Sequence, residues 1–421
     1  MSQIHVIGAG LAGLSAALSL SAKGQTVVVH EAGPAAGGRC RSYFDKELDL
    51  PIDNGNHLLL SGNTAAKAYI SEIGAEDAFQ VRHRAVFPFV DLKTGERWTI
   101  RPNNGRVPWW VLKGNRAVPE TRLTDYMGMA QIVRIRDDTS VADSMRRGRL
   151  YWRLLEPLAV AALNTPSQEG LARLLGSVMR ETLMRGGRAC IPMLPKQGLS
   201  DAMVNPAVTT LQGRGVDVRF NSRIAALTVT DGRVTALRGP DGVIPLGPQD
   251  SVVLAVPPWV AAELLPGLVT PDAFQAILNV HFRHQADPKG LLAEAGFIGT
   301  TSGFAEWIFM KLGHISITIS AANQQVDDGA RVIAARVWPN VVDALGLQPG
   351  LKEAMPAYRV VKERRATFAA TAAQERRRPG VRTDQASNVA LAGDWTATGL
   401  PATIEGAIRS GRSAADVLLA L

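Results

Sequence analysis

The beginning of the chain alternates short apolar runs with glycine-rich turns. Residues 4–7 form an apolar run long enough for one buried strand, and residues 26–30 form a second. Between them lie a glycine-rich turn and an Ala/Leu/Ser-rich stretch, 14–23, which Gly24 ends. Short apolar runs bounded by turns are typical of buried strands, and longer periodic stretches are typical of helices. The first 30 residues therefore predict a strand–turn–helix–strand unit.

The rest of the chain predicts a mixture of helices and strands. We expect mainly helix from about 60 to 190, broken by a strand-like patch at 85–99 and a Trp/Arg/Pro-rich loop at 101–125. Alternation of apolar and polar residues predicts strands at 217–231, and a buried apolar run predicts one at 251–256. We also expect strands joined by turns at 275–340. The closing segment, 388–421, predicts a strand, a loop and a helix. This pattern indicates one α/β unit, built from both ends of the chain and interleaved with a mixed α+β unit.

Length and composition fit a globular protein of two domains. The chain has 421 residues, of which 46% are hydrophobic and 20% charged, and this length exceeds one ordinary domain. There is no run of eighteen or more apolar residues, so we expect no membrane-spanning helix. The early glycines argue against a cleaved signal peptide. Two cysteines, Cys40 and Cys190, give neither a disulfide framework nor a metal site. We expect a cytoplasmic protein without a metal.

The charge balance bears on partners. A formal net charge of +8 favours contact with anionic surfaces. No recognisable nucleic-acid-binding module accompanies the charge, so nucleic acid is not an expected partner. Peripheral contact with the inner face of the cytoplasmic membrane and a fully solvated basic surface are the two interpretations left open.

The glycine-rich turn has the spacing of a dinucleotide site. Gly8 permits a tight turn out of the strand, Gly10 lets the backbone approach a diphosphate, and Gly13 lets the helix pack closely on the sheet. Ala12 lies in the same turn, and the start of its helix favours negative charge. Glu31 ends the second strand, where a carboxylate accepts hydrogen bonds from a ribose diol. The acid disfavours a 2′-phosphate, so NADP is not expected.

The loop after the second strand favours FAD over NAD. It contains Gly38 and Arg39 in a Gly-Gly-Arg sequence. A guanidinium placed here would contact the second face of the diphosphate, to which a bidentate cation is suited. The alternative is an ordinary basic surface loop.

The end of the chain supplies the second half of the predicted FAD site. A strand closes with Gly393 and Asp394, and Asp394 is placed to bond a ribityl hydroxyl. Thr403 and Ile404 open the last helix, whose start would face the pyrimidine end of the flavin, where reduction places negative charge. This segment has no cysteine, so we expect non-covalent FAD.

These motifs resemble those of the flavin amine oxidase and carotenoid desaturase superfamily. The markers are GAGLAG, the acid at Glu31, the GGRxxS stretch that ends at Ser42 and the block LAGDWTATGLPATIEGA. The resemblance implies a GR2-type flavoprotein with a Rossmann-like FAD-binding domain, in which the backbone of Ile224 contacts the adenine side of FAD. Near Asn279 the chain lacks the lysine that the amine-oxidising branch places by the flavin. That difference and the missing cysteine count against amine oxidation.

One subgroup is more similar still. Residues 52–62 (IDNGNHLLLSG), 161–166 (AALNTP) and 279–282 (NVHF) resemble blocks of the bacterial hydroxysqualene dehydroxylases, also called squalene-associated FAD-dependent desaturases. The resemblance implies reductive dehydroxylation of hydroxysqualene to squalene in hopanoid or related triterpenoid synthesis. With the pattern above, it predicts an FAD-binding domain in 1–60, 195–268 and 355–421 and a substrate-binding domain in 61–194 and 269–354.

Such a reaction requires a general acid within hydrogen-bond reach of the leaving oxygen. The resemblance places Asp53 and His57 near the flavin, and these are our candidate catalytic residues. His281 and Glu405 are weaker candidates. Each has a structural alternative: a turn-shaping role for Asp53, hydrogen bonding to backbone for His57, a structural role for His281, and stabilisation of a helix N-terminus for Glu405.

A hydrocarbon substrate requires an apolar channel with few polar groups. We expect 154–163, preceded by Trp152, to form either a wall of this channel or a plain helix core. The loop 108–113, which contains Trp109 and Trp110 among basic residues, has the character of an interfacial anchor. The alternative is that its tryptophans are buried.

Two other functions remain open from sequence. One is desaturation of a polyprenoid on the same scaffold, with flavin accepting rather than giving hydride. The other is a non-catalytic FAD-binding subunit of a squalene-forming complex. The chain has no second dinucleotide motif, so the electron donor is unknown.

Overall fold

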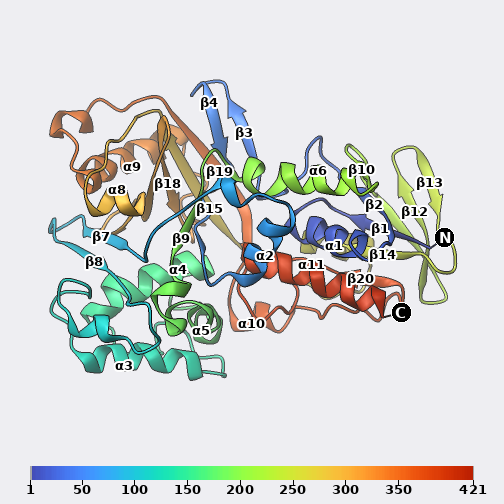
Figure 1. Cartoon of the computed structure of the whole chain (residues 1–421), viewed down its shortest axis with the longest axis horizontal. Helices are drawn as coiled ribbons and strands as arrows, with labels where there is room; N and C mark the ends of the chain where they lie inside the picture. Colours follow the sequence, from blue (N-terminus) through green and yellow to red (C-terminus); the bar gives the residue numbers. More distant parts are fainter. Residues whose placement is uncertain (1, 421) are drawn as a thin grey trace.

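The computed structural model describes residues 2–420, which form two parts arranged along the long axis of the molecule (Figure 1). The core of one part is a five-stranded parallel sheet. Its strands are, in spatial order, β10 (Asp217–Arg219), β2 (Thr26–His30), β1 (Gln3–Ile7), β14 (Ser251–Leu254) and β20 (Val389–Leu391). With α1 (Leu11–Ser21), β1 and β2 confirm the predicted strand–turn–helix–strand unit. The Rossmann-like α/β fold expected from the sequence is present.

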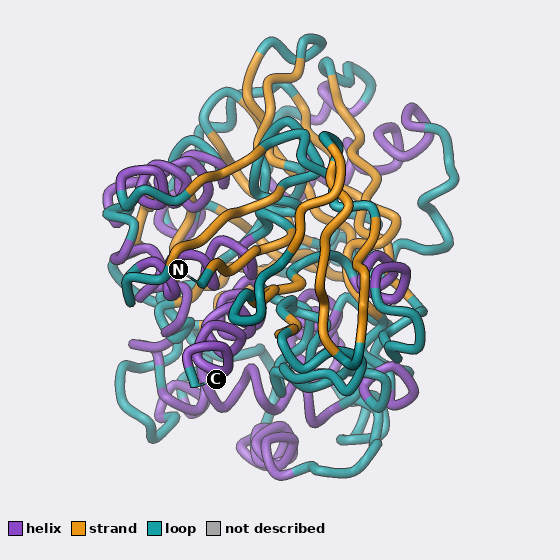
Figure 2. Tube along the Cα trace, turned by 90° about the vertical axis from the view of Figure 1, so that its right-hand side faces the viewer, coloured by secondary structure: helices purple, strands orange, loops and turns teal. Residues whose placement is uncertain are grey.

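Helices cover one face of this sheet and a small antiparallel sheet covers the other. One apolar cluster joins the first face to α1, α2 (Thr64–Glu72), α6 (Asn205–Gly213) and α11 (Ile404–Leu419). A second cluster joins the opposite face to β11 (Ala226–Thr230), β12 (Arg233–Gly239) and β13 (Gly242–Pro245). Figure 2 shows the strands crossing the middle of the molecule with helices outside them. The parallel sheet is therefore buried on both faces, as parallel sheets usually are.

The first and last helices are in direct contact. A Cβ atom added to Gly411 of α11 would lie 2.1 Å from the carbonyl oxygen of Ala12 in α1. The Ser15 hydroxyl donates to the carbonyl of Ile408 at 2.9 Å. Because Gly411 has no side chain, the two backbones approach closely enough for this bond, which joins the two ends of the chain.

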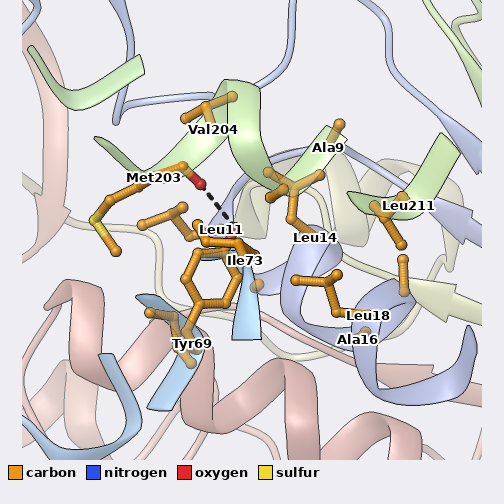
Figure 3. Packing of buried hydrophobic residues seen from close by; sticks show 14 of the residues in the cluster. Ala9, Leu11, Leu14, Ala16, Leu18, Tyr69, Ile73, Met203, Val204 and Leu211 are labelled. Carbon is orange, nitrogen blue, oxygen red and sulfur yellow. Dashed lines mark hydrogen bonds between the residues drawn. The ribbon is translucent and has the colours of Figure 1, made fainter. Parts of the chain in front are cut away.

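A buried hydrogen bond lies in the cluster beside α1. The side chain of Tyr69, in α2, is fully buried, and its hydroxyl donates to the Met203 carbonyl at 2.9 Å. Leu11, Leu14 and Ile73 lie around it (Figure 3). The bond ties α2 to the turn that precedes α6.

The second part is built on a seven-stranded mixed sheet. In spatial order its strands are β19 (Tyr358–Phe368), β15 (Phe274–Phe282), β18 (His314–Ile319), β17 (Trp307–Lys311), β16 (Phe297–Thr301), β7 (Phe87–Asp91) and β8 (Arg97–Ile100). One face packs on α9 (Ala330–Leu345). Side chains of the other face share a cluster with α3 (Leu123–Gln131), α4 (Glu156–Leu163) and α5 (Ala172–Glu181). These helices lie beneath the sheet at the left of Figure 1.

Three sequence-based assignments differ from the structure. The expected run of strands at 275–340 ends in α9, whose valines favour strand locally but fall on one helical face with Ile333, Val337 and Val341 buried. The predicted boundary at residue 355 gives β19 to the FAD-binding part, whereas β19 pairs with β15 of the seven-stranded sheet. The boundary at residue 60 excludes α2, whose apolar side chains complete the cluster beside α1. Both boundaries differ because long-range packing, not local pattern, decides them.

Two small antiparallel sheets complete the fold. β3 (Ser42–Asp45) pairs with β4 (Leu50–Asp53), and β9 (Pro192–Pro195) lies between β5 (Leu59–Leu60) and β6 (Phe79–Val81). Within residues 2–420, no helix has both the length and the apolar character needed to cross a bilayer.

We predict that Tyr69→Phe lowers the free energy of unfolding by about 1–2 kcal/mol, because the carbonyl of Met203 loses its donor inside an apolar cluster. Denaturant unfolding followed by circular dichroism measures the change. An unchanged free energy of unfolding would show that the hydrogen bond of Tyr69 does not stabilise the fold and that only the packing of its ring does.

Candidate active site

The turn between β1 and α1 has room for a diphosphate. Added Cβ atoms would lie 2.5 Å from the Ala255 carbonyl at Gly8 and 1.9 Å from the Gly8 carbonyl at Gly13, so both glycines permit close backbone packing. At Gly10, by contrast, an added Cβ would meet no atom within 4 Å. No side chain caps α1 and no acid lies in its first turn, which includes Ala12. Open space beside uncapped N–H groups fits an anionic diphosphate.

Glu31 lies at the carboxyl end of β2 beside this turn. Its carboxylate accepts hydrogen bonds from the backbone N–H groups of Ala9 and Gly33, each at 2.8 Å. The N–H of Ser222 donates to the Glu31 carbonyl at 2.8 Å, which brings the chain leading to Ile224 to the same edge of the sheet. The Ile224 side chain is buried in the cluster that contains Ile7. Its contact with adenine stays a prediction.

An ion pair joins the two predicted halves of the cofactor site. The guanidinium of Arg39 lies 2.7 Å from the Asp394 carboxylate and also donates to the carbonyl of Ala366. The Asp394 side chain is only 8% exposed, whereas that of Arg39 remains 43% exposed and keeps donors free for a ligand. Gly38 packs on the glycine turn, because a Cβ atom added to it would lie 3.5 Å from the Gly10 Cα. The structure therefore brings Gly38 and Arg39 to the predicted diphosphate site.

The start of α11 is also ordered as the sequence predicts. Thr403 is the N-cap residue, and its hydroxyl accepts a hydrogen bond from the Gly406 N–H at 3.0 Å. Ile404 is buried directly after it. The N–H of Gly393 donates to the Ser410 hydroxyl at 2.9 Å, which holds the strand end against the helix. Asp394, the residue after Gly393, reaches Arg39 at this edge of the sheet.

The glycine turn, Arg39 and Asp394 together form what we call the cofactor cradle. Asp53 is buried beside this cradle, and its carboxylate has three polar partners. One carboxylate oxygen lies 2.7 Å from the Lys311 ammonium. The other accepts from the Ser42 hydroxyl at 2.6 Å and from the Leu199 N–H at 2.8 Å. Burial alone would raise the pKa of Asp53, but the ammonium and the hydrogen bonds outweigh it and hold the pKa below its usual value. Asp53 is therefore a carboxylate at neutral pH.

His57 lies four residues further along the same segment. Its Nε2 atom is 3.9 Å from the Cys40 sulfur. Burial lowers the pKa of His57 to about 4, although the Asp53 charge opposes this shift. The imidazole is therefore neutral at pH 7. The catalytic roles expected for Asp53 and His57 stay predictions.

The two weaker candidates have different surroundings. The Glu405 carboxylate accepts from the N–H groups of Ala65 and Ala66, at 2.9 and 2.8 Å, and pairs with Arg409. It therefore caps α2, in line with the structural alternative. His281 is fully buried in β15, and neither ring nitrogen has a partner among the described residues. Burial lowers its pKa well below the usual value.

Asp53 and His57 line a cavity of about 290 Å³. The apolar part of its wall consists of Leu194, Pro195, Gly296, Phe309, Met310 and Leu312. The polar part consists of Asp53, Asn56, His57, Gln80, Arg82, Lys196 and Lys311. The volume of this cavity is at the lower end of the range for ligand pockets. Its wall contains more polar side chains than we expected for a channel that binds a hydrocarbon.

The segment 154–163 does not line this cavity. It forms a π-helical turn and α4, with Leu154, Leu155 and Leu163 in the core between α4 and its neighbours. Glu156 and Val160 of the same segment line a second cavity, of about 270 Å³, so the segment is part core and part cavity wall, and Trp152 is 47% exposed.

Sequence analysis did not single out Lys311, Lys196 or Arg82. Lys311 ends the otherwise apolar strand β17, and a lone charge at such a position was the available signal. The partner of Lys311 is 258 residues away, so local pattern could not pair them.

The fold and the glycine cradle define a flavoprotein oxidoreductase. Residues 11–285 and 316–419 match the family model of flavin containing amine oxidoreductases. The chain is 16% identical to a putative protoporphyrinogen oxidase from Exiguobacterium sp. 255-15, with a TM-score of 0.69 over 100% of this chain and 99% of that one. That likeness shows the shared fold. The cofactor is FAD, and the open space at Gly10 and the exposed donors of Arg39 fit its diphosphate.

Sequence relatives narrow the assignment. The chain is 48% identical to the hydroxysqualene dehydroxylase of Rhodopseudomonas palustris, over 99% of this chain and 98% of the relative. It is 44% identical to that of Zymomonas mobilis, over 100% of this chain and 99% of the relative. The chain belongs to the hydroxysqualene dehydroxylase family, which confirms the resemblance drawn from the sequence.

We predict that Gly10→Ala weakens FAD binding by at least tenfold without destabilising the apoprotein. The backbone of Gly10 has a φ of −71°, which alanine adopts readily, and the new methyl group would enter the open space. Flavin titration and thermal unfolding of the apoprotein measure the two effects. Gly148→Ala is the control, because its Cβ also meets nothing within 4 Å but lies outside the cradle. Unchanged affinity of Gly10→Ala for FAD would show that the diphosphate does not bind beside Gly10.

Proposed function

We propose that this protein reduces hydroxysqualene to squalene with FAD as its redox cofactor. The observation that carries the proposal is the near full-length identity of 48% to a hydroxysqualene dehydroxylase. A cavity that shares the Asp53–His57 segment with the surroundings of the cofactor cradle supports it. The cavity would hold the hydroxyl-bearing part of the substrate, because its polar wall suits an alcohol and its volume is small for a whole triterpenoid.

The reaction replaces a carbon–oxygen bond by a carbon–hydrogen bond. Bound FAD in its reduced form supplies a hydride for the carbon. The glycine turn, Glu31, Arg39 and Asp394 would hold the cofactor, and the chain would also have to supply a proton for the departing oxygen. Asp53 and His57 lie at the cavity where that proton is needed.

Anaerobic turnover tests the proposal. Enzyme reduced chemically before mixing should convert hydroxysqualene to squalene, one molecule for each reduced flavin, as followed by mass spectrometry. Oxidised enzyme that instead desaturates a polyprenoid would support the alternative reaction. Flavin-loaded protein that changes neither substrate would support a non-catalytic subunit.

We predict that Asp53→Asn lowers squalene formation by about 100-fold or more, because the partly buried ammonium of Lys311 loses its counter-charge. His57→Ala should lower the rate by about tenfold or more through the changed cavity wall. Both rates are measured in a single turnover, with flavin content as the check on folding. Normal turnover in both variants would remove this segment from the catalytic site.

We also propose that the protein contacts an anionic membrane through the loop 108–113 and the adjoining start of α3. Four apolar side chains of this surface, and Val107 directly before it, are at least half exposed; the four are Trp109, Leu112, Leu123 and Met127. Arg106, Lys113 and Arg122 are exposed beside them. Exposed apolar side chains ringed by cations suit an interface of anionic lipid. Trp110 is not part of this surface, because it is buried against Tyr126.

We predict that Trp109→Ser lowers flotation with anionic liposomes several-fold, because an indole that is 62% exposed would no longer enter the interface. Val243→Ser is the matched control, since Val243 is 65% exposed but lies on β13 in the other part of the molecule. Equal flotation of the wild type and Trp109→Ser would exclude the loop as an anchor.

A further inference from the structure

Lys311 is held at the cavity wall by a buried counter-ion. Its ammonium lies 2.7 Å from the Asp53 carboxylate, and the two side chains are 22% and 4% exposed. Both residues line the same cavity as His57. Because Asp53 is fixed by Ser42 and Leu199, the position of the ammonium is fixed as well.

The other groups at this site are poor proton donors. Asp53 is a carboxylate with both oxygens occupied by donors. The histidines His57, His281 and His314 are neutral at pH 7, since burial lowers the pKa of each. A neutral imidazole is a much weaker acid than an imidazolium.

Three cationic side chains line the cavity: Arg82, Lys196 and Lys311. An arginine keeps its proton under all conditions in proteins. Lys196 is exposed, and no hydrogen-bond or ion-pair partner positions its ammonium among the described residues. Lys311 alone of the three is an ammonium that a buried carboxylate holds in place.

We propose that Lys311 donates the proton to the departing hydroxyl oxygen and that Asp53 is its positioning residue. This inference rests on the proposed dehydroxylation. The carbon–oxygen bond breaks with its electron pair on oxygen, an N–H bond of Lys311 breaks, and the new O–H bond completes a water molecule. The carbon takes the hydride from reduced flavin, which is oxidised. The neutral amine regains a proton from solvent through the cavity.

The acidity of an ammonium suffices for this transfer. Hydroxide is a much stronger base than a primary amine. Transfer from the ammonium to a departing hydroxide is therefore downhill.

Lys311→Arg separates proton donation from charge. Arginine keeps the positive charge and a carboxylate partner, but it does not release a proton. We expect normal flavin content and a single-turnover rate of squalene formation that is lower by about 10²–10⁴-fold. An arginine variant as fast as the wild type would overturn the proposal.

Chemical rescue provides a second, independent measurement. Lys311→Ala should be similarly slow, and methylamine or ethylamine should restore part of the rate in a saturable way, with the more acidic ammonium of a series acting faster. The control is Lys352→Ala, because Lys352 forms an exposed pair with Asp343 at the same 2.7 Å distance, outside the cavity. Its rate should match the wild type with or without amine.

The outcomes are distinguishable. A folded, flavin-loaded Lys311→Ala enzyme that no amine rescues would overturn the role of Lys311. If this variant loses its fold because Asp53 is left unpaired, the arginine variant decides. If wild-type enzyme with reduced flavin forms no squalene, the proposed function itself fails, whatever the variants do.

Discussion

The close packing of α1 against α11 is the constraint on which the cofactor site depends. The two helices meet where Gly411 leaves space for the Ala12 carbonyl, so the first and last segments of the chain share one side of the parallel sheet. With α11 seated there, β20 joins β14 and brings Asp394 to Arg39. A side chain at position 411 would separate the helices and, with them, the two halves of the cradle.

Sequence reasoning succeeded where the evidence was local. The turn containing Gly8, Gly10 and Gly13 and the acid of Glu31 lie within one strand–helix–strand unit, so spacing alone predicts their geometry. It failed where distant segments decide the outcome. Strand β19 is assigned by its pairing with β15, and α9 is a helix because one face meets the sheet. For β19 no local signal exists, whereas the spacing of Ile333, Val337 and Val341 in α9 was a helical signal that the sequence reading missed.

The candidate catalytic site shows the same division. Asp53 and His57 stand in a recognisable block, and the structure places both at one cavity. The sequence could not predict that Asp53 is a saturated carboxylate, because its partners Ser42, Leu199 and Lys311 come from three different segments. The neighbouring Asn54 amide reaches the carbonyl of Arg39 at 3.5 Å. The cofactor cradle and the cavity therefore share one stretch of backbone, so a displacement of the backbone at one site also displaces the other.

The order of strands in the parallel sheet has a consequence for biosynthesis. β1 is made long before one of its two neighbours, β14, which begins at residue 251. At a synthesis rate of roughly 5–20 residues per second, the ribosome needs roughly 10–50 s to add that neighbour. During this interval one edge of an apolar strand has no native partner, and such edges pair readily with other chains. The nascent polypeptide thus passes through an aggregation-prone stage, during which a chaperone able to shield the amino-terminal strands would raise the yield of folded protein.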